Sequence, residues 1–303
     1  MKLRIFFVSI VLVILLSVAL AQQPGQSIRQ RLSEETIVHR DLPYVTNGHE
    51  RQKLDLYLPK TDNDKKLPLI IWIHGGAWLA GSKDGGVPRA YLVDGYAVAS
   101  LNYRLSQHAI FPAQIQDCKA AVRWLRANAK KYNIDPNSFA AWGPSAGGHL
   151  VAMLGTTGDV KTFDVGGHLK VSSRVQAVVD YFGPTDLLQM ADHRLPDGMI
   201  HNTADSPESK LIGGHIQKNK EKAAKANPIT YVTKDDAPFL IIHGDRDPLV
   251  PHHQSELLEA ALKKAGVPVS FYTVKGAGHG GFKDPNVPKL TRQFLEKHLK
   301  PKK

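Results

Sequence analysis

The fold is decided by residues 140–149, Ala-Ala-Trp-Gly-Pro-Ser-Ala-Gly-Gly-His. The apolar residues before Gly143 are typical of the end of a buried strand, and the small residues that follow begin a helix. In the pattern Gly143-x-Ser145-x-Gly147 the serine sits on a sharp strand-to-helix turn, where glycines leave room for close backbone contacts. Such a turn exposes the serine hydroxyl beside the N–H of Ala146 and the positive end of the helix. Short patterns also arise by chance, so the rest of the chain decides what this one means.

Apolar runs and helical patterns alternate on both sides of this turn. Continuous apolar runs typical of strands buried on both faces occur at residues 69–73, 97–102, 175–181, 239–243 and 269–274. Amphipathic or apolar helices are predicted at 113–132, 146–156, 253–265 and 288–299. A leading hairpin is predicted from 38–42 and 53–58. This alternation predicts a mostly parallel, doubly wound α/β sheet.

The first 21 residues are predicted to lie outside the fold. A short basic segment precedes an apolar run over residues 5–16, and Ala19-Leu20-Ala21 supplies a small-x-small cleavage pattern. These features are typical of a secretory signal peptide, and an uncleaved membrane anchor is the alternative. We therefore expect a secreted or periplasmic protein, with one domain over residues 22–303 and no stable membrane insertion after cleavage.

Composition excludes several other classes of protein. The 303 residues are 42% hydrophobic and 22% charged, which is typical of a globular chain with a sizeable core. The formal net charge is +11, but no aromatic residues interleave the basic runs and no nucleic-acid motif accompanies them. We read these runs as solvated surface and expect no nucleic-acid partner. The single cysteine, Cys118, excludes an internal disulfide and is predicted to be buried.

Residues 183–236 differ from the rest of the chain in composition and in hydrophobic pattern. They are rich in Pro, Asp, His and Lys and show little strand periodicity. We expect an irregular, partly helical, cap-like insertion over the edge of the sheet. Its histidines, His193, His201 and His215, lack metal-ligand spacing and are predicted to lie on the surface. Neither a metal nor a cofactor is predicted.

A serine nucleophile needs a base and a group that orients the base. His279 follows the last predicted strand in a glycine-rich loop and is the candidate base. Asp247 follows the preceding strand and is the candidate orienting acid. Asp245 competes with it, although its position only two residues past the strand favours a role within its own loop. The order Ser, acid, His is typical of one hydrolase fold.

The segment His74-Gly75-Gly76-Ala77-Trp78 follows a central strand, where backbone donors for an oxyanion are expected. Glycines at this position allow bare N–H groups to face a substrate, and losing one such donor costs ~10²–10³ in rate. The alternative is a tight turn with no catalytic part. Trp78 is predicted to pack beside the donors rather than to bind a sugar.

Taken together, these motifs resemble those of α/β-hydrolases of the esterase and lipase group with an HGG motif. The chain is similar to hormone-sensitive-lipase-like esterases and more closely to secreted bacterial carbohydrate esterases of the BD-FAE type. The resembling segments include residues 53–59, 101–105, 111–114, 183–186 and 243–247. The resemblance implies a catalytic set made of Ser145 as nucleophile, Asp247 as acid, His279 as base, and the N–H groups of Gly75, Gly76 and Ala146 as oxyanion hole.

Two residues depart from the pattern of many relatives. Ala77 replaces a third glycine, as in the HGG-x-W branch that includes formamidases, and Pro144 replaces Glu, Asp or Gly before the serine. The resemblance implies a serine esterase that acts through an acyl-enzyme on a small-molecule or carbohydrate-linked ester, such as an acetyl or feruloyl ester. An amidase, peptidase or formamidase of the same fold, or a non-catalytic binding relative, remains an alternative. Pattern alone specifies neither the acyl group nor the oligomeric state.

Overall fold

In this computed structural model, residues 35–61 and 65–300 are described. The chain divides into two units, Met1–Glu35 and Thr36–Lys303, and the second contains every helix and strand of the described residues. The predicted signal peptide, residues 1–21, lies outside the described part. None of the helices within that part is long and apolar enough to span a bilayer.

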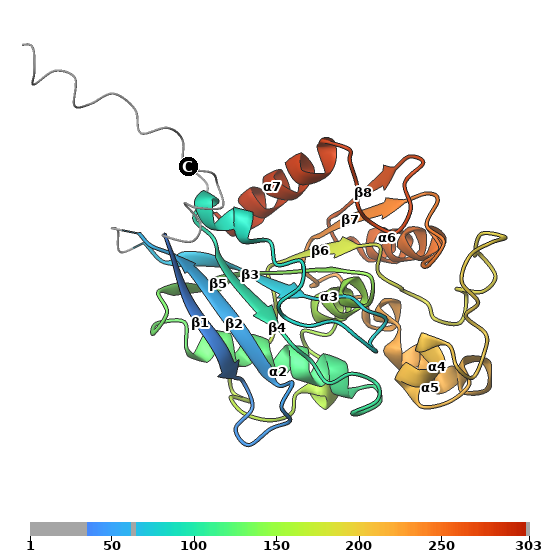
Figure 1. Cartoon of the computed structure of the whole chain (residues 1–303), viewed down its shortest axis with the longest axis horizontal. Helices are drawn as coiled ribbons and strands as arrows, with labels where there is room; N and C mark the ends of the chain where they lie inside the picture. The colour runs from blue at the N-terminus through green and yellow to red at the C-terminus, as the bar shows by residue number, and fades with distance from the viewer. Residues whose placement is uncertain (1–34, 62–64, 301–303) are drawn as a thin grey trace, which may run out of the picture. The chain divides into compact units, whose positions relative to one another are not determined.

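An eight-stranded sheet forms the centre of the second unit (Figure 1). Its strands are β1 (Thr36–Pro43), β2 (Lys53–Pro59), β3 (Leu67–Ile73), β4 (Ala97–Leu101), β5 (Ile134–Pro144), β6 (Ala177–Tyr181), β7 (Phe239–Gly244) and β8 (Val269–Val274), in the spatial order β1-β2-β4-β3-β5-β6-β7-β8. Only the pairings β1–β2 and β2–β4 are antiparallel. The predicted hairpin and the mostly parallel, doubly wound α/β sheet are therefore confirmed.

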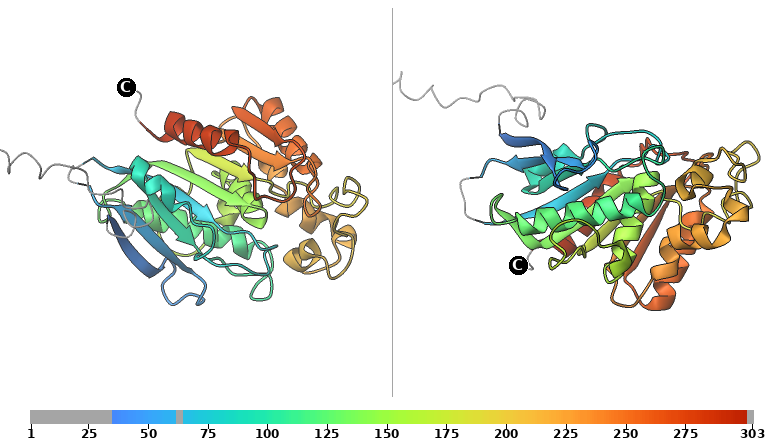
Figure 2. Two further views of the ribbon diagram at one scale, coloured as in Figure 1. Left: turned by 45° about the horizontal axis from the view of Figure 1, so that its top comes forward. Right: turned by 90° about the horizontal axis from the view of Figure 1, so that it is seen from below.

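Helices cover both faces of the sheet (Figure 2). One face carries α2 (Ala113–Ala127), α3 (Ala146–Thr156) and α6 (His253–Ala265), and the other carries the short helix η1 (Arg89–Asp94) and α7 (Asn286–Leu299). The prediction that the first of these helices reaches residue 132 is wrong. It ends at Ala127, and the Nδ2 of Asn128 then bonds the carbonyl of Trp124 while the chain turns toward β5.

Burial explains the apolar runs seen in the sequence. Every residue of β4 is buried, and so are all residues of β3 except Pro68. By contrast, β8 lies at the edge and is mostly half-buried. Strands covered on both faces need apolar side chains at successive positions rather than at alternate ones. Because β3, β5, β7 and β8 run in the same direction, the loops at their carboxyl ends lie at the same edge of the sheet.

The segment 183–236 connects β6 to β7. It contains two short α-helices, α4 (Pro207–Ile212) and α5 (Lys220–Ala226), and two 3-10 turns, η3 (Ile216–Lys218) and η4 (Pro228–Tyr231). Figure 1 shows α4 and α5 together beyond one end of the sheet. Buried Leu187, Met190 and Leu211 join this insertion to the main core. The insertion therefore packs on the domain rather than standing apart from it.

Candidate active site

Ser145 occupies the turn between β5 and α3 in a strained conformation. Its φ of 56° and ψ of −125° lie outside the regions that most side chains adopt. A Cβ at Gly147 would lie 2.1 Å from the carbonyl oxygen of Ile73, and one at Gly143 would lie 2.6 Å from the same atom. The turn therefore needs both glycines, because any side chain would collide with backbone.

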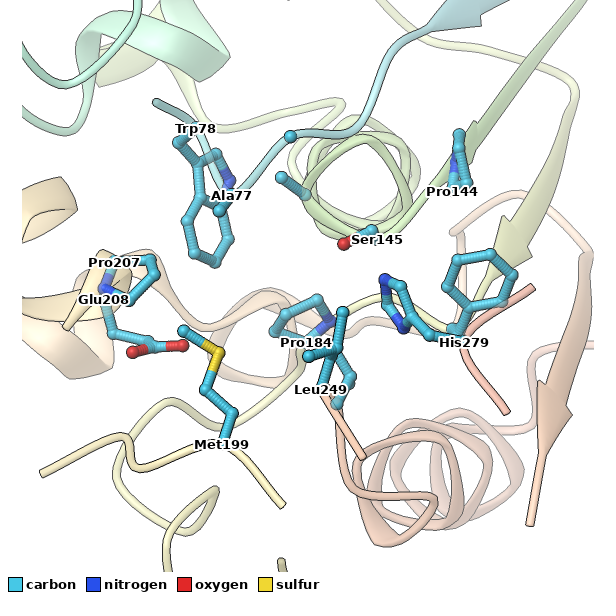
Figure 3. Close-up of a pocket in the computed structure, with 14 residues that line it drawn as sticks. Ala77, Trp78, Pro144, Ser145, Pro184, Met199, Pro207, Glu208, Leu249 and His279 are labelled. Carbon is cyan, nitrogen blue, oxygen red and sulfur yellow. The ribbon is translucent and has the colours of Figure 1, made fainter. Parts of the chain in front are cut away.

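His279 lies opposite the turn and is held by an acid. Its Nδ1 donates a hydrogen bond of 2.6 Å to Oδ2 of Asp247. Ser145 and His279 line the same pocket, and Figure 3 shows the imidazole facing the serine hydroxyl. Because Nδ1 carries the proton given to the carboxylate, Nε2 is the nitrogen left to accept one. The structure thus brings together three residues that span more than a hundred positions of the chain.

Asp247 is surrounded by donors. Its Oδ1 accepts the N–H groups of Leu249 and Val250 at 2.8 and 2.9 Å, and its Oδ2 accepts from His279 and, at 3.2 Å, from Nε2 of His243. Burial by itself raises the pKa of this carboxyl group, but hydrogen bonds from the two imidazoles outweigh it and lower the pKa well below its usual range. Asp247 is therefore a fixed negative charge.

His243 was missed by sequence reasoning as a functional residue. It is fully buried at the end of β7, and its Nε2 also contacts the carbonyl of Val250 at 3.0 Å. Its Nδ1 lies 2.7 Å from the hydroxyl of Ser255. Both groups facing Nε2 are acceptors, so this nitrogen carries a proton and donates it toward Asp247. The signal that could have revealed it is the pair His243-Gly244 directly before the acid loop.

Asp245, the competing acid, binds its own loop. Oδ1 accepts the N–H of Gly276 at 2.6 Å, and Oδ2 lies 3.3 Å from Nζ of Lys275. These bonds lower the pKa of Asp245, with the backbone bond from Gly276 as the largest cause. The carboxylate thus ties the two loops together, and His279 pairs with Asp247 instead.

The HGG segment forms a left-handed turn beside the elbow. Gly76, Ala77 and Trp78 have φ values of 107°, 55° and 57°, and all three line the pocket together with Ala146. Within the described residues, no protein acceptor is found for the N–H groups of Gly76, Ala77 or Ala146. These amides are available to a ligand. No protein acceptor is found among the described residues for the N–H of Gly75 either, but Gly75 does not line the pocket, so its donor role stays a prediction.

The side chain of His74 supports the HGG turn through contacts with Tyr103, Gly75 and Arg51. Its ring stacks on Tyr103 with centroids 4.4 Å apart, and its Nδ1 bonds the carbonyl of Gly75 at 2.7 Å. Nε2 then accepts from the guanidinium of Arg51, which also bonds the carbonyl of Gly81. Burial lowers the pKa of His74 to about 4, so the ring is neutral at pH 7. The neutral ring fixes the direction of the turn without adding charge beside the nucleophile.

His149 connects three parts of the site. It is fully buried on α3, and its Nδ1 accepts the indole N–H of Trp78 at 3.1 Å. Its Nε2 lies 2.7 Å from the carbonyl of Ala226, to which it donates. Burial lowers the pKa of His149 to about 4, which agrees with a neutral ring that accepts at one nitrogen and donates at the other. Trp78 is 2% exposed and packs beside the free amides, and it also lines the pocket; that it packs rather than binds a sugar stays a prediction.

The pocket itself has a volume of about 380 Å³. Its walls are mostly apolar and include Trp78, Pro184, Met199, Leu249 and Val250. Apolar walls exclude water and so strengthen the electrostatic interactions of the groups that face the cavity. The arrangement therefore combines a nucleophile, a base, an oriented acid and free amides in one apolar cavity.

Comparison with known proteins identifies the family. The family model BD-FAE matches residues 54–262. The chain belongs to the BD-FAE family. The match includes the HGG turn, the elbow and Asp247, whereas His279 lies beyond its end. The resemblance to esterases of the BD-FAE type is thereby confirmed.

Solved structures and sequence relatives agree with this membership. A truncated form of a carbohydrate esterase from gut microbiota matches with a TM-score of 0.80 and 38% identity, over 88% of this chain and 97% of that one. A bifunctional GH43-CE protein of Bacteroides eggerthii matches with a TM-score of 0.79 and 37% identity, over 86% of this chain and 35% of that one. Esterase LipC of Mycobacterium tuberculosis is 33% identical over 76% of this chain. This chain spans 57% of the length of LipC.

One expectation about the insertion of this BD-FAE member is wrong. His201 was predicted to lie on the surface, but it is 1% exposed, because its Nδ1 lies 2.9 Å from Oε1 of the equally buried Glu208. His215 is half-buried, and only His193 is exposed as predicted. Glu208 lines the pocket, and sequence reasoning missed it. Nothing in a single Pro-Glu-Ser segment signals burial, since its partner is supplied by the fold.

Proposed function

We propose that this BD-FAE family member is an exported serine esterase that hydrolyses carboxylic esters of carbohydrates through an acyl-enzyme. The observation that carries the proposal is the strained Ser145 facing His279, whose other nitrogen is bound by a buried, fully hydrogen-bonded Asp247. The carbohydrate esterase from gut microbiota that matches over 97% of its length supports the substrate class. Export is supported by the basic, apolar and small-residue pattern of the first 21 residues.

In the first half-reaction Ser145 Oγ attacks the ester carbonyl carbon. His279 Nε2 accepts the serine proton as the new C–O bond forms, and the carbonyl electron pair moves onto oxygen. When the tetrahedral intermediate collapses, the bond to the alcohol oxygen breaks and His279 returns the proton to that oxygen. In the second half-reaction water attacks the acyl-enzyme in the same way, which releases the acid and restores Ser145.

Charge stabilisation comes from two parts of the site. The free N–H groups of Gly76, Ala77 and Ala146 are the donors placed to bind the developing oxyanion, and each such donor contributes ~10²–10³ in rate. Asp247 stabilises the imidazolium that forms on His279, because its low pKa keeps it negative throughout the cycle. Since Asp247 stays negative and His279 gains and returns the proton, His279 acts as the base and Asp247 as the acid that orients it.

The decisive test is Ser145→Ala measured on a panel of acetylated sugars, feruloyl esters and p-nitrophenyl esters. We expect ester hydrolysis to fall by about 10⁶-fold, with an unchanged unfolding transition. A fluorophosphonate probe should label the wild type at Ser145 and not the variant, which separates an esterase from a non-catalytic binder. Wild-type-like hydrolysis by Ser145→Ala would overturn the proposal. Faster cleavage of matched amides than of esters would assign the site to an amidase.

A further inference from the structure

One carboxylate in the pocket has an oxygen with no partner. Among the described residues that line the cavity, Glu208 is the only Asp or Glu. Its side chain is 3% exposed, and Oε1 is held by His201 at 2.9 Å, whereas Oε2 has no hydrogen-bond partner. Figure 3 shows this carboxylate beside Met199, across the pocket from Ser145. The residue that carries this buried, unpaired oxygen therefore lines the cavity that also holds the nucleophile.

A buried acceptor without a donor is destabilising, and native proteins rarely keep one without a reason. The apolar residues around Glu208, including Pro207 and Met199, supply no donor. His201 is already used on Oε1, and its own Nε2 is buried without a hydrogen-bond partner. A hydroxyl group on a substrate that enters the pocket would supply the missing donor.

The chemistry of the pocket selects the kind of donor. Apolar walls suit the C–H faces of a ring, and a lone carboxylate oxygen suits a hydroxyl group on that ring. We propose that Glu208 accepts a hydrogen bond from a hydroxyl of the alcohol portion of the substrate and so selects esters of polyols over simple alkyl esters. This inference rests on the proposed esterase function. His201 is a positioning residue that holds the carboxylate toward the cavity.

The test uses two esters that differ by one hydroxyl group: trans-2-hydroxycyclohexyl acetate and cyclohexyl acetate. We expect the wild type to have the higher kcat/KM on the hydroxylated ester. Glu208→Leu should reduce that preference by about 10- to 100-fold, the size of a lost hydrogen bond to a charged group. Glu208→Gln should reduce it by a smaller factor, because an N–H₂ group then faces the pocket and can donate only a neutral hydrogen bond to the hydroxyl oxygen.

Two controls separate the possible outcomes. Met199→Leu changes the same wall without a polar group and should alter both rates alike. Thermal unfolding of each variant identifies a folding defect, and Glu208→Gln keeps the test open if Glu208→Leu does not fold. An unchanged preference in a folded Glu208 variant overturns this inference and leaves the esterase proposal intact. If the wild type hydrolyses neither of these two esters and no ester of the panel above, both this inference and the esterase proposal are overturned.

Discussion

Two carboxylate–imidazole pairs each contribute one residue, His279 or Glu208, to the lining of the same pocket, and they differ in how completely the carboxylate is hydrogen-bonded. In the pair Asp247–His279, both carboxylate oxygens are occupied, by two backbone N–H groups and two imidazoles. In the pair Glu208–His201, one oxygen is held and the other has no partner. The first arrangement fixes a charge in place, whereas the second leaves an acceptor for a ligand. The same chemical groups therefore serve orientation in one case and recognition in the other.

A third buried carboxylate shows what the imidazoles contribute. Asp180 on β6 is fully buried and accepts one bond, from the N–H of Gly183 at 2.9 Å, while its Oδ2 has no partner. Burial, only partly offset by that bond, raises the pKa of Asp180 to about 7. Asp247 is also buried, yet its pKa moves in the opposite direction because four donors surround it.

Among substitutions of the carboxylates and of the imidazoles bound to them, the largest effect is expected for Asp247→Asn. The amide cannot hold the imidazole of His279 in the same tautomer, so kcat should fall by about 10³- to 10⁴-fold. Steady-state kinetics on p-nitrophenyl acetate measures this loss. Glu208→Gln should lower the same kcat far less. A comparable loss in both variants would erase the distinction between an orienting pair and a recognition pair.

Asp180→Asn tests the partly satisfied carboxylate through the pH dependence of stability. The folded state keeps the proton up to about pH 7, because the pKa of Asp180 is raised, whereas an unfolded aspartate loses it near its ordinary pKa of 3.8. Wild-type stability contributed by Asp180 is thus complete below pH 4, declines as the pH rises from 4 to 7, and changes no further above that. Relative to the wild type, the variant should gain about 3–4 kcal/mol in free energy of unfolding between pH 4 and pH 8. Urea unfolding at both pH values measures it, and a constant difference would contradict a raised pKa.

His243→Leu removes one of the two imidazoles on Asp247. Because a hydrogen bond to a charged group is lost, kcat should fall by about 10- to 100-fold while KM changes little. Ser255→Ala, which leaves the His243–Asp247 contact in place, is the matched control and should lose less. If only thermal stability changes and kcat does not, His243 is a core residue without influence on the acid.

The smallest effect is expected for Asp245→Asn. This carboxylate is partly exposed and serves its own loop, so we expect a change in kcat of less than about threefold. Measured beside Asp247→Asn, it decides between the two acids that the sequence offers. A loss as large as that of Asp247→Asn would move the orienting role to Asp245.

Sequence reasoning was most successful where local geometry limits the residues. Gly143 and Gly147 are required because a Cβ would strike the carbonyl of Ile73, and continuous apolar runs mark strands covered on both faces. It failed for His201, for Glu208 and for the end of α2. In each case the outcome depends on a partner or a turn that periodicity does not encode.

The sequence by itself determined the α/β class and the order of serine, acid and histidine, because strand period and glycine sterics act over a few residues. Only the tertiary structure decided which acid meets His279, which amides face the pocket, and that His201 and Glu208 are buried together. Those outcomes depend on contacts between segments that the chain brings from far apart. Burial then decides which polar atoms are satisfied and which are left free to bind a ligand.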